Sequence, residues 1–162
     1  KEDTLVTIQI DMLLAQRFGM EYVDVDGTKK NPYIIHRTSL GCYERTLAYL
    51  IEKYAGALPL WLSPEQVRIL PITDRAKDYA ESIAKRFDDM NMRVTVDNRN
   101  EKIGYKIRQA QLEKIPYFFI LGDKEVEDNT VSLRSRKDGD LGASPLEDVI
   151  AKIVKENAEK AR

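Results

Sequence analysis

Hydrophobic and polar residues alternate along the first third of the chain in a way that predicts short, paired strands. In TLVTIQIDM (residues 4–12), Leu5 is apolar and the second half of the segment alternates strictly. A second alternating segment, MEYVDV (20–25), runs into the turn signal Asp26-Gly27, and PYIIH (32–36) is again strand-like. Because the connections between these strands are short, we expect them to pair antiparallel.

A helix and then a break are predicted next. Leu47, Leu50, Ile51 and Tyr54 recur at spacings of three and four, which is the period of an amphipathic helix, and Gly56 is expected to end it. The following ALPLWLSP (57–64) has prolines on both sides of a tryptophan and cannot continue as a regular helix. We therefore expect two domains, residues 1–60 and residues 61–162.

From residue 65 onward, strand-like runs alternate with helical periodicity. The predicted strands are 66–70, 93–96, 117–121 and 130–134, and the predicted helices are 74–87, which Asp74 would cap, 103–112 and 145–154. The all-apolar YFFIL (117–121) is typical of a strand buried on both faces, whereas TVSLR (130–134) is predicted at an edge. This order predicts an α/β fold with a mixed, mainly parallel sheet flanked by helices, preceded by an antiparallel β plus helix piece.

Composition narrows the class of protein. Lys and Arg number 26 and Asp and Glu number 27, a net charge of −1, which argues against a globally basic nucleic-acid-binding domain. No apolar run approaches the roughly 18 to 20 residues of a membrane-spanning helix. Cys42 and His36 are the single cysteine and histidine, so neither an internal disulfide nor a self-contained Cys/His zinc site can form. We expect a reduced, cytoplasmic, globular protein.

One short segment departs from this neutral balance. Residues 98–108 contain four cationic side chains and one carboxylate, directly after the second predicted strand of the alternating part. Ligands of open α/β sheets bind outside the carboxyl ends of the strands. The loop at Arg99-Asn100, the loop at 122–125 and Arg134 are therefore expected to meet on one rim, where amide, carboxylate and guanidinium groups suit the edges of unstacked bases.

Specific strings extend this interpretation. IHRTSLGCYER (35–45) resembles motif 3 of class II aminoacyl-tRNA synthetases, in the form seen in the threonyl-tRNA synthetase family. TIQID (7–11) is similar to the catalytic-domain strand before that motif, and PLWLSPEQVRILPI (59–72) resembles the junction into the family's anticodon-binding domain. NRNEKIGYKIR (98–108) and LGDKEVE (121–127) resemble that domain's two most recognisable strings. The resemblance covers nearly the whole chain and implies a C-terminal piece without motifs 1 and 2.

For residues 1–60, the resemblance implies parts of a catalytic site. Arg45 would contact the γ-phosphate of ATP, Gly41 and Cys42 would lie beside the nucleotide, and Gln9 would face the aminoacyl-adenylate pocket. His36 would be one of three protein ligands of a zinc ion that selects threonine, and its partners, a cysteine and a histidine, are absent from this chain. The residues alone also allow plainer interpretations: a surface arginine, a helix-entry glycine, an inert cysteine, a polar strand residue and an ordinary histidine.

For residues 61–162, the resemblance implies recognition of the threonine anticodon. Asn100, Glu125 and Arg134 would read bases, and Lys102, Arg108 and Lys124 would assist on bases or phosphates. From the residues alone, the cationic segment is also consistent with an ordinary solvated helix face.

The implied function is part of a threonine–tRNA ligase, a homodimeric enzyme that uses ATP, Mg²⁺ and Zn²⁺ to attach threonine to its tRNA. We expect this chain mainly to carry anticodon recognition, to be inactive alone and to retain no zinc. The alternatives are a non-enzymatic RNA-binding or regulatory paralogue, a prolyl- or glycyl-type relative, and a small nucleotide-binding domain. The last ranks lowest, because no glycine-rich phosphate loop follows any predicted strand.

Overall fold

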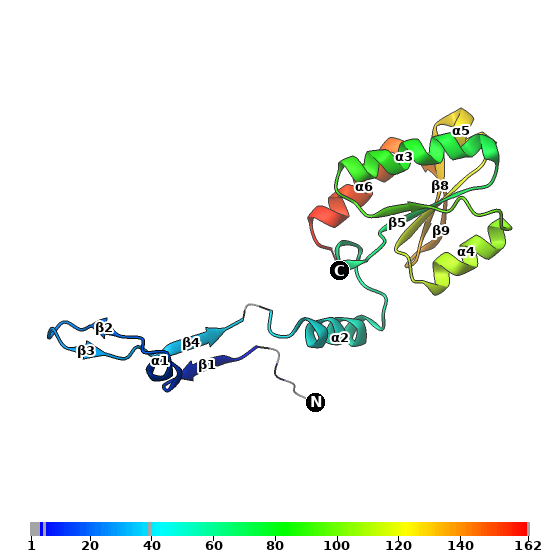
Figure 1. Cartoon of the computed structure of the whole chain (residues 1–162). Helices are drawn as coiled ribbons and strands as arrows, with labels where there is room; N and C mark the ends of the chain where they lie inside the picture. The colour runs from blue at the N-terminus through cyan, green and yellow to red at the C-terminus, as the bar shows by residue number, and fades with distance from the viewer. Residues whose placement is uncertain (1–3, 5, 39, 162) are drawn as a thin grey trace. The chain divides into compact units, whose positions relative to one another are not determined.

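The chain divides into two compact units, Lys1–Lys53 and Tyr54–Arg162, in the computed structural model (Figure 1). The structure describes residues 4, 6–38 and 40–161. Leu5, an apolar position of the first predicted strand, and Ser39, within the motif 3 string, lie outside the described residues. No helix among the described residues has the length and apolar character needed to cross a bilayer.

The first unit contains the antiparallel strands that the alternating pattern predicts. Strand β1 (Ile8–Asp11) pairs antiparallel with β4 (Ile34–Arg37), and β2 (Tyr22–Val23) forms a hairpin with β3 (Lys29–Lys30). Helix α2 (Tyr43–Tyr54) confirms the predicted helix. The short α1 (Leu14–Arg17) was not predicted, since four residues are too few to show a helical period. Its first turn is stabilised by Asp11, whose Oδ1 accepts the backbone N–H groups of Leu13 and Leu14 at 2.8 and 2.7 Å.

The described part of the first unit encloses almost no core. Ala15 is its one buried hydrophobic residue. Ile8, Ile10 and Ile35 lie on one face of the β1–β4 pair and are 65%, 60% and 66% exposed. Leu47, on the apolar side of α2, is 53% exposed. Strands β1 and β4 and helix α2 each have an apolar face of the kind that is normally buried. Among the described residues, no second layer covers these faces.

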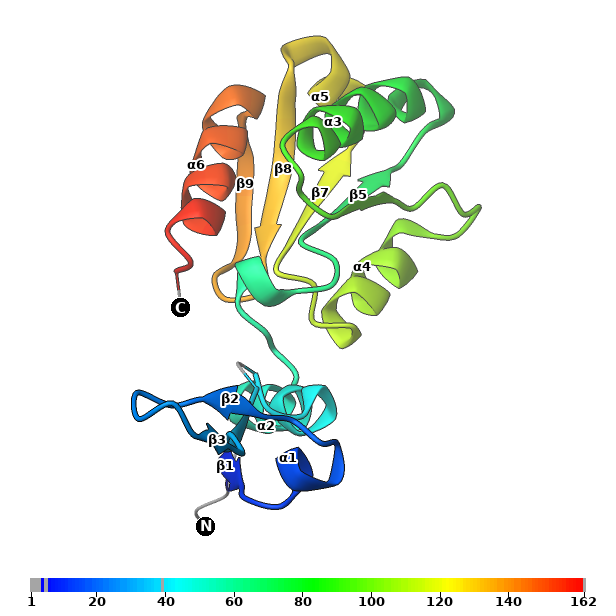
Figure 2. The ribbon, with the colours of Figure 1, turned by 60° about the vertical axis from the view of Figure 1, so that its left-hand side comes forward.

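The second unit is built on a mixed sheet whose described strands follow the order β6-β5-β7-β8-β9. Figure 2 shows β5, β7, β8 and β9 side by side. Its elements are β5 (Val67–Pro71), α3 (Lys77–Asp89), β6 (Val94–Val96), α4 (Ile103–Leu112), β7 (Tyr117–Leu121), α5 (Asp123–Asp128), β8 (Thr130–Ser135), β9 (Gly139–Pro145) and α6 (Leu146–Ala158). Strand β5 pairs parallel with β6 and β7, and β8 pairs antiparallel with β7 and β9. The predicted α/β class is confirmed.

Three predictions of local structure were wrong. Strand β8 lies inside the sheet, because β9 pairs along its outer side. The sequence of β9, GDLGASP, contains turn-forming residues and no apolar alternation, so its pattern predicts a loop. Helix α5 begins where a loop was expected, directly after β7. Asp74 caps no helix: it lies in the 3₁₀ turn η2 (Asp74–Ala76), and its carboxylate pairs with Lys77 at 2.7 Å.

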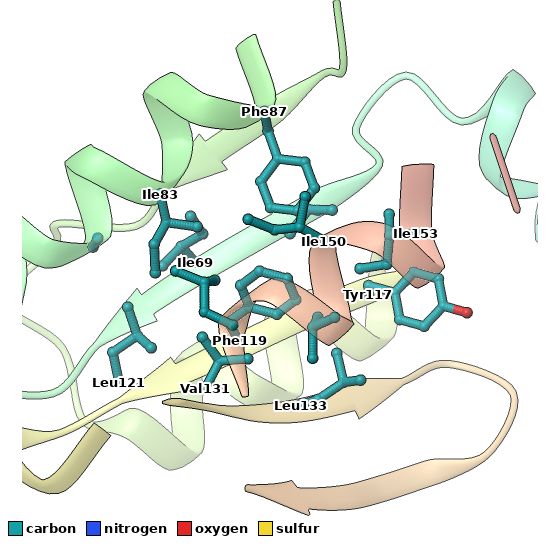
Figure 3. Close-up of a cluster of buried hydrophobic side chains, with 14 of the residues drawn as sticks. Ile69, Ile83, Phe87, Tyr117, Phe119, Leu121, Val131, Leu133, Ile150 and Ile153 are labelled. Carbon is teal, nitrogen blue, oxygen red and sulfur yellow. The ribbon is translucent and has the colours of Figure 1, made fainter. Parts of the chain in front are cut away.

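The sheet is covered unequally on its two faces. Helices α3 and α6 pack on one face over a continuous core that includes Phe119, and the rings of Phe87 and Phe119 lie 5.9 Å apart (Figure 3). Helix α4 packs on the other face, where Ala110 and Ile115 contact Phe118 and Leu70. The prediction that YFFIL is buried on both faces is therefore confirmed.

Strand β8 is only partly covered on the α4 side of the sheet. Ser132 lies opposite Ile120, and Arg134 lies opposite Phe118, so both side chains share the face that α4 covers. Both are half-buried, whereas Val131 and Leu133 are buried in the larger core.

Two leucine-to-alanine substitutions test which residues hold this unit together. Leu121 is fully buried at the end of β7, and Leu112 is 64% exposed at the end of α4. We expect Leu121→Ala to lower the free energy of unfolding by about 2–5 kcal/mol, because it leaves a cavity in the core. Leu112→Ala removes the same atoms from the surface and should change it by less than about 0.5 kcal/mol. Urea denaturation measures both, and equal losses would contradict the assigned core.

Candidate functional site

The connections of the parallel strands diverge at the carboxyl ends of β5 and β6. Strand β5 continues into α3 on one face of the sheet, whereas β6 continues into α4 on the other. Such a switch point is where open α/β sheets bind ligands. It is formed here by the residues after β5, beginning with Ile72, and by Asp97 to Asn100 after β6.

Asp97 organises the loop that follows β6. Its backbone N–H donates to the carbonyl of Ile69 at 2.9 Å, which ties the loop to β5. Its buried carboxylate accepts Nε of Arg99 at 2.9 Å and Nη2 at 2.7 Å, and its carbonyl accepts Nζ of buried Lys106 at 2.8 Å. The hydrogen bonds from the Arg99 guanidinium hold the pKa of Asp97 below its usual range, against the effect of burial.

The exposed charge of this segment is consequently smaller than its sequence indicates. Arg99 and Lys106 are both engaged by Asp97, whereas Lys102 at the start of α4 and Arg108 on α4 are exposed. Asn100 is also exposed, and its side chain has no hydrogen bond among the described residues. The structure thus places three of the predicted RNA contacts on the surface of one short stretch.

The other predicted rim residues lie in the first turn of α5. Oε2 of Glu125 accepts the backbone N–H of Gly122 at 2.9 Å, which stabilises the start of this helix. A side chain at Gly122 would place its Cβ 3.1 Å from that oxygen, so the turn is tight. Glu125 is half-buried with one oxygen engaged, and the neighbouring Lys124 is exposed. Glu125 therefore has a structural role beside any role in binding.

Arg134 does not lie on this rim, and the expectation of a single rim is wrong for it. Strand β8 runs antiparallel to β7 and carries Arg134 back to a position opposite Phe118. The distance along β7 from there to Leu121 is about 10 Å, at about 3.4 Å per residue. Arg134 instead lines a pocket of about 170 Å³ beside the end of α4, together with Gln111, Ile115 and Phe118.

The guanidinium of Arg134 is only partly satisfied. Its Nη2 donates to Oδ2 of Asp140 at 2.6 Å, and its buried Nε has no hydrogen-bond partner among the described residues. The backbone N–H of Gly142, and then Arg134, hold the pKa of Asp140 below its usual range. A buried donor without a partner is rare in folded proteins, so the Nε of Arg134 is an unusual feature of β8.

Within the first unit, the structure brings Gln9 and His36 together. They lie directly opposite each other on β1 and β4, and Nε2 of His36 is 3.9 Å from Oδ2 of Asp11. The described residues contain no group of three or more His, Cys, Asp or Glu side chains placed to hold a metal. His36 and Asp11 alone do not complete the tetrahedral ligand set that zinc requires.

The remaining predicted residues lie at the junction between β4 and α2. Gly41 adopts a positive φ of 70°, a conformation that favours glycine. The exposed Cys42 donates its S–H to Oε2 of Glu44 at 2.8 Å, which lowers the pKa of that carboxyl. Nη1 of Arg45 donates to the carbonyl of Thr4 at 2.8 Å, and its side chain is at the surface.

Comparison with known families assigns the second unit. The family described as "Anticodon binding domain" matches residues 66–156, which is more than half of the chain and includes every strand of the mixed sheet. The chain therefore belongs to the anticodon-binding domain family, as the strings at 98–108 and 121–127 indicate.

Curated relatives narrow the similarity further. The chain is 58% identical over 160 residues to the threonine–tRNA ligase of Clostridium perfringens strain 13, covering 99% of this chain and 25% of the relative. It is 53% identical over 155 residues to that of Caldanaerobacter subterraneus subsp. tengcongensis, covering 96% of this chain and 24% of the relative. The chain thus spans about a quarter of the length of the curated relatives it matches.

Solved structures agree in fold. The RNA-binding domain of threonyl-tRNA synthetase from Cryptosporidium parvum Iowa II matches with a TM-score of 0.76 and 33% identity, covering 96% of this chain and 40% of that one. Prolyl-tRNA synthetase from Cryptosporidium parvum matches with a TM-score of 0.75 over 96% of this chain and 34% of that one. At 23% identity, the second likeness shows the fold alone.

The lowered pKa of Asp97 predicts a pH dependence of stability. A carboxyl whose pKa is lower in the folded state stabilises the fold above its ordinary pKa and loses this effect as the pH falls through the folded value. We expect the wild type to be more stable than Asp97→Asn near neutral pH, and the difference to shrink below about pH 4.

Urea denaturation across a pH series measures this difference. Asp88→Asn is the matched control, because Asp88 is exposed on α3 and its side chain has no hydrogen bond among the described residues. Its effect on the free energy of unfolding at neutral pH should be less than about 0.5 kcal/mol. A gap between wild type and Asp97→Asn that is constant from about pH 7 to about pH 3 would contradict the assigned role of the charge.

Proposed function

We propose that this chain is the C-terminal part of a threonyl-tRNA synthetase and carries its recognition of the tRNA anticodon. The observation that supports this most is 58% identity to a threonine–tRNA ligase over 99% of the chain, with an anticodon-binding domain in its second unit. The parent protein uses ATP with Mg²⁺ to activate threonine and transfers it to the tRNA. In this proposal it is a cytoplasmic homodimer.

The two parts of the chain have different roles in this proposal. Residues 61–162 are the anticodon-binding domain, and residues 1–60 are the end of the catalytic domain. The exposed apolar face of Ile8, Ile10 and Ile35 supports the second assignment, because such a face needs a further layer to cover it. The second unit, in contrast, encloses its own core.

In the catalytic part, Arg45 contacts the γ-phosphate of ATP, and Gly41 and Cys42 lie beside the nucleotide. A guanidinium is permanently charged and offers planar donors, which suit a phosphate. Gln9 contacts the bound aminoacyl-adenylate. His36 contributes one nitrogen ligand to zinc, and the other ligands come from outside this chain. In the parent, the metal would supply discrimination of threonine from valine, which lacks the hydroxyl group.

In the anticodon-binding domain, Asn100, Glu125 and Arg134 read successive unstacked bases. Their spread from the carboxyl rim to the C-terminal end of β8 supports several contacts along a strand of RNA, since bases splayed from a loop are read one at a time. Arg134 lines the pocket beside the end of α4, which supports a base acceptor there. Lys102, Arg108 and Lys124 are exposed and contact bases or phosphates at the edges of this surface.

RNA binding tests the anticodon assignment. We expect the chain to bind a stem-loop with the threonine anticodon, with an affinity that falls as salt rises. Asn100→Ala and Arg134→Ala should each weaken binding by about 1–3 kcal/mol, the usual value of a base-reading contact. Fluorescence anisotropy measures both.

The matched control is Arg86→Ala. Arg86 forms a surface ion pair with Glu147 at 2.7 Å, on the opposite face of the sheet from Arg134. We expect it to leave RNA affinity unchanged. If Arg134→Ala and Asn100→Ala bind as tightly as this control, the base-reading roles are wrong.

An activity assay distinguishes this chain from the parent protein. We expect the purified chain to show no threonine-dependent exchange of pyrophosphate into ATP, because motifs 1 and 2 are outside it. The parent protein should show the exchange. Exchange by the chain alone would contradict this assignment, and an inactive parent that still binds RNA would indicate the non-enzymatic paralogue instead.

A further inference from the structure

Arg99, in the loop after β6, differs from Arg68 of β5 in the N–H groups that its guanidinium leaves free. The side chain of Arg68 is 10% exposed, and its donors are shared between Glu65 and Glu113. The side chain of Arg99 is 53% exposed and is bound from one side only, by Asp97, whose side chain is 5% exposed. Arg68 is therefore enclosed by acceptors, whereas Arg99 presents an open edge to solvent.

The donors of Arg99 that remain are fixed in direction. A guanidinium carries five N–H groups in a planar fork. Asp97 takes Nε–H and one N–H of Nη2, at 2.9 and 2.7 Å. The N–H groups of Nη1 and the second N–H of Nη2 are left, and they project away from the carboxylate. The backbone N–H of Asp97 donates to Ile69 and its backbone carbonyl accepts Lys106, and its carboxylate is buried, so the group that orients the fork has a defined position.

This geometry favours a base over a phosphate. Asp97 offsets the charge of Arg99, which reduces the electrostatic attraction that makes an arginine a good phosphate contact. It leaves two parallel donors at a set angle, and these match a base edge with two adjacent acceptors, as O6 and N7 of guanine provide. The loop also contains Asn100, so the fork lies where the proposed function needs base contacts.

We infer that Arg99 reads a guanine-like base edge in the anticodon loop and that Asp97 is its positioning residue. This inference rests on the proposed function and adds a specificity-determining pair to it. Arg99 selects the base through its open edge. Asp97 orients the guanidinium and lowers its affinity for phosphates, so that contacts with non-cognate RNA are weakened.

The experiment compares variants of the full chain on a panel of stem-loops. The panel holds the threonine anticodon stem-loop and versions in which each loop base is replaced singly. Arg99→Lys keeps the charge but removes the fork, so we expect it to lose about tenfold or more of the discrimination at one loop position. Its dependence on salt should stay unchanged, since the number of cations is the same.

Two further variants distinguish the orientation of the Arg99 guanidinium from its charge. Asp97→Asn should lose discrimination at the same loop position and also bind non-cognate loops more tightly, with a salt slope steeper by about one unit, because Arg99 is no longer neutralised. Lys102→Gln should do the reverse: its slope becomes shallower by about one unit, and its discrimination is retained. Thermal unfolding of each variant confirms that the fold is kept.

Three results would overturn the inference. Arg99→Lys could discriminate at every position as the wild type does, it could weaken all stem-loops equally, or Asp97→Asn could leave the salt slope unchanged in a folded protein. In each case the wild type still binds the threonine stem-loop and the proposed function stands. A wild type that binds no stem-loop overturns the proposed function, and this inference with it.

Discussion

The second unit depends on the burial of β7 between two unequal helical layers. Phe119 and Leu121 enter the core under α3 and α6, and Phe118 enters the smaller core under α4. A strand that is apolar on both faces can only lie inside a sheet, so β5 and β8 must flank it. The positions of the loops after β6 and β7, and hence of every candidate contact on the rim, follow from this arrangement.

The candidate site residues lie outside the two hydrophobic cores, in the loop after β6 and on the α4 side of β8. Beyond the carboxyl end of β6, the backbone no longer pairs with a neighbouring strand. There the carboxylate of Asp97 accepts Arg99, and its backbone carbonyl accepts Lys106. On the α4 side of β8, the buried Nε of Arg134 stays without a partner among the described residues. Among the described residues, the sheet thus has one group of polar residues that satisfy one another, around Asp97, and one buried donor that lacks a partner, in Arg134.

In the first unit, the apolar residues that the sequence pattern places on one face are not buried. Its strands and helix have clear amphipathic patterns, yet Ile10 and Ile35 stay exposed and Ala15 is the one buried hydrophobic residue among those described. Local propensity and hydrogen bonding are sufficient to form these elements, whereas burial needs a second layer. Gln9 and His36 are aligned by strand pairing alone, and further ligands or a substrate pocket would require that layer.

Hydrophobic periodicity by itself determined the strands and long helices of the second unit, the buried character of YFFIL and the class of the fold, because these depend on local spacing. The strings at 98–108 and 121–127 likewise determined the family. Strand β9 and helix α5 were missed, since one lacks apolar alternation and the other is too short to show a period. Only the tertiary structure decided that Arg134 lies away from the rim and that Asp97 engages Arg99 and Lys106. Register and ion pairing depend on which segments meet in space, and no local pattern records that.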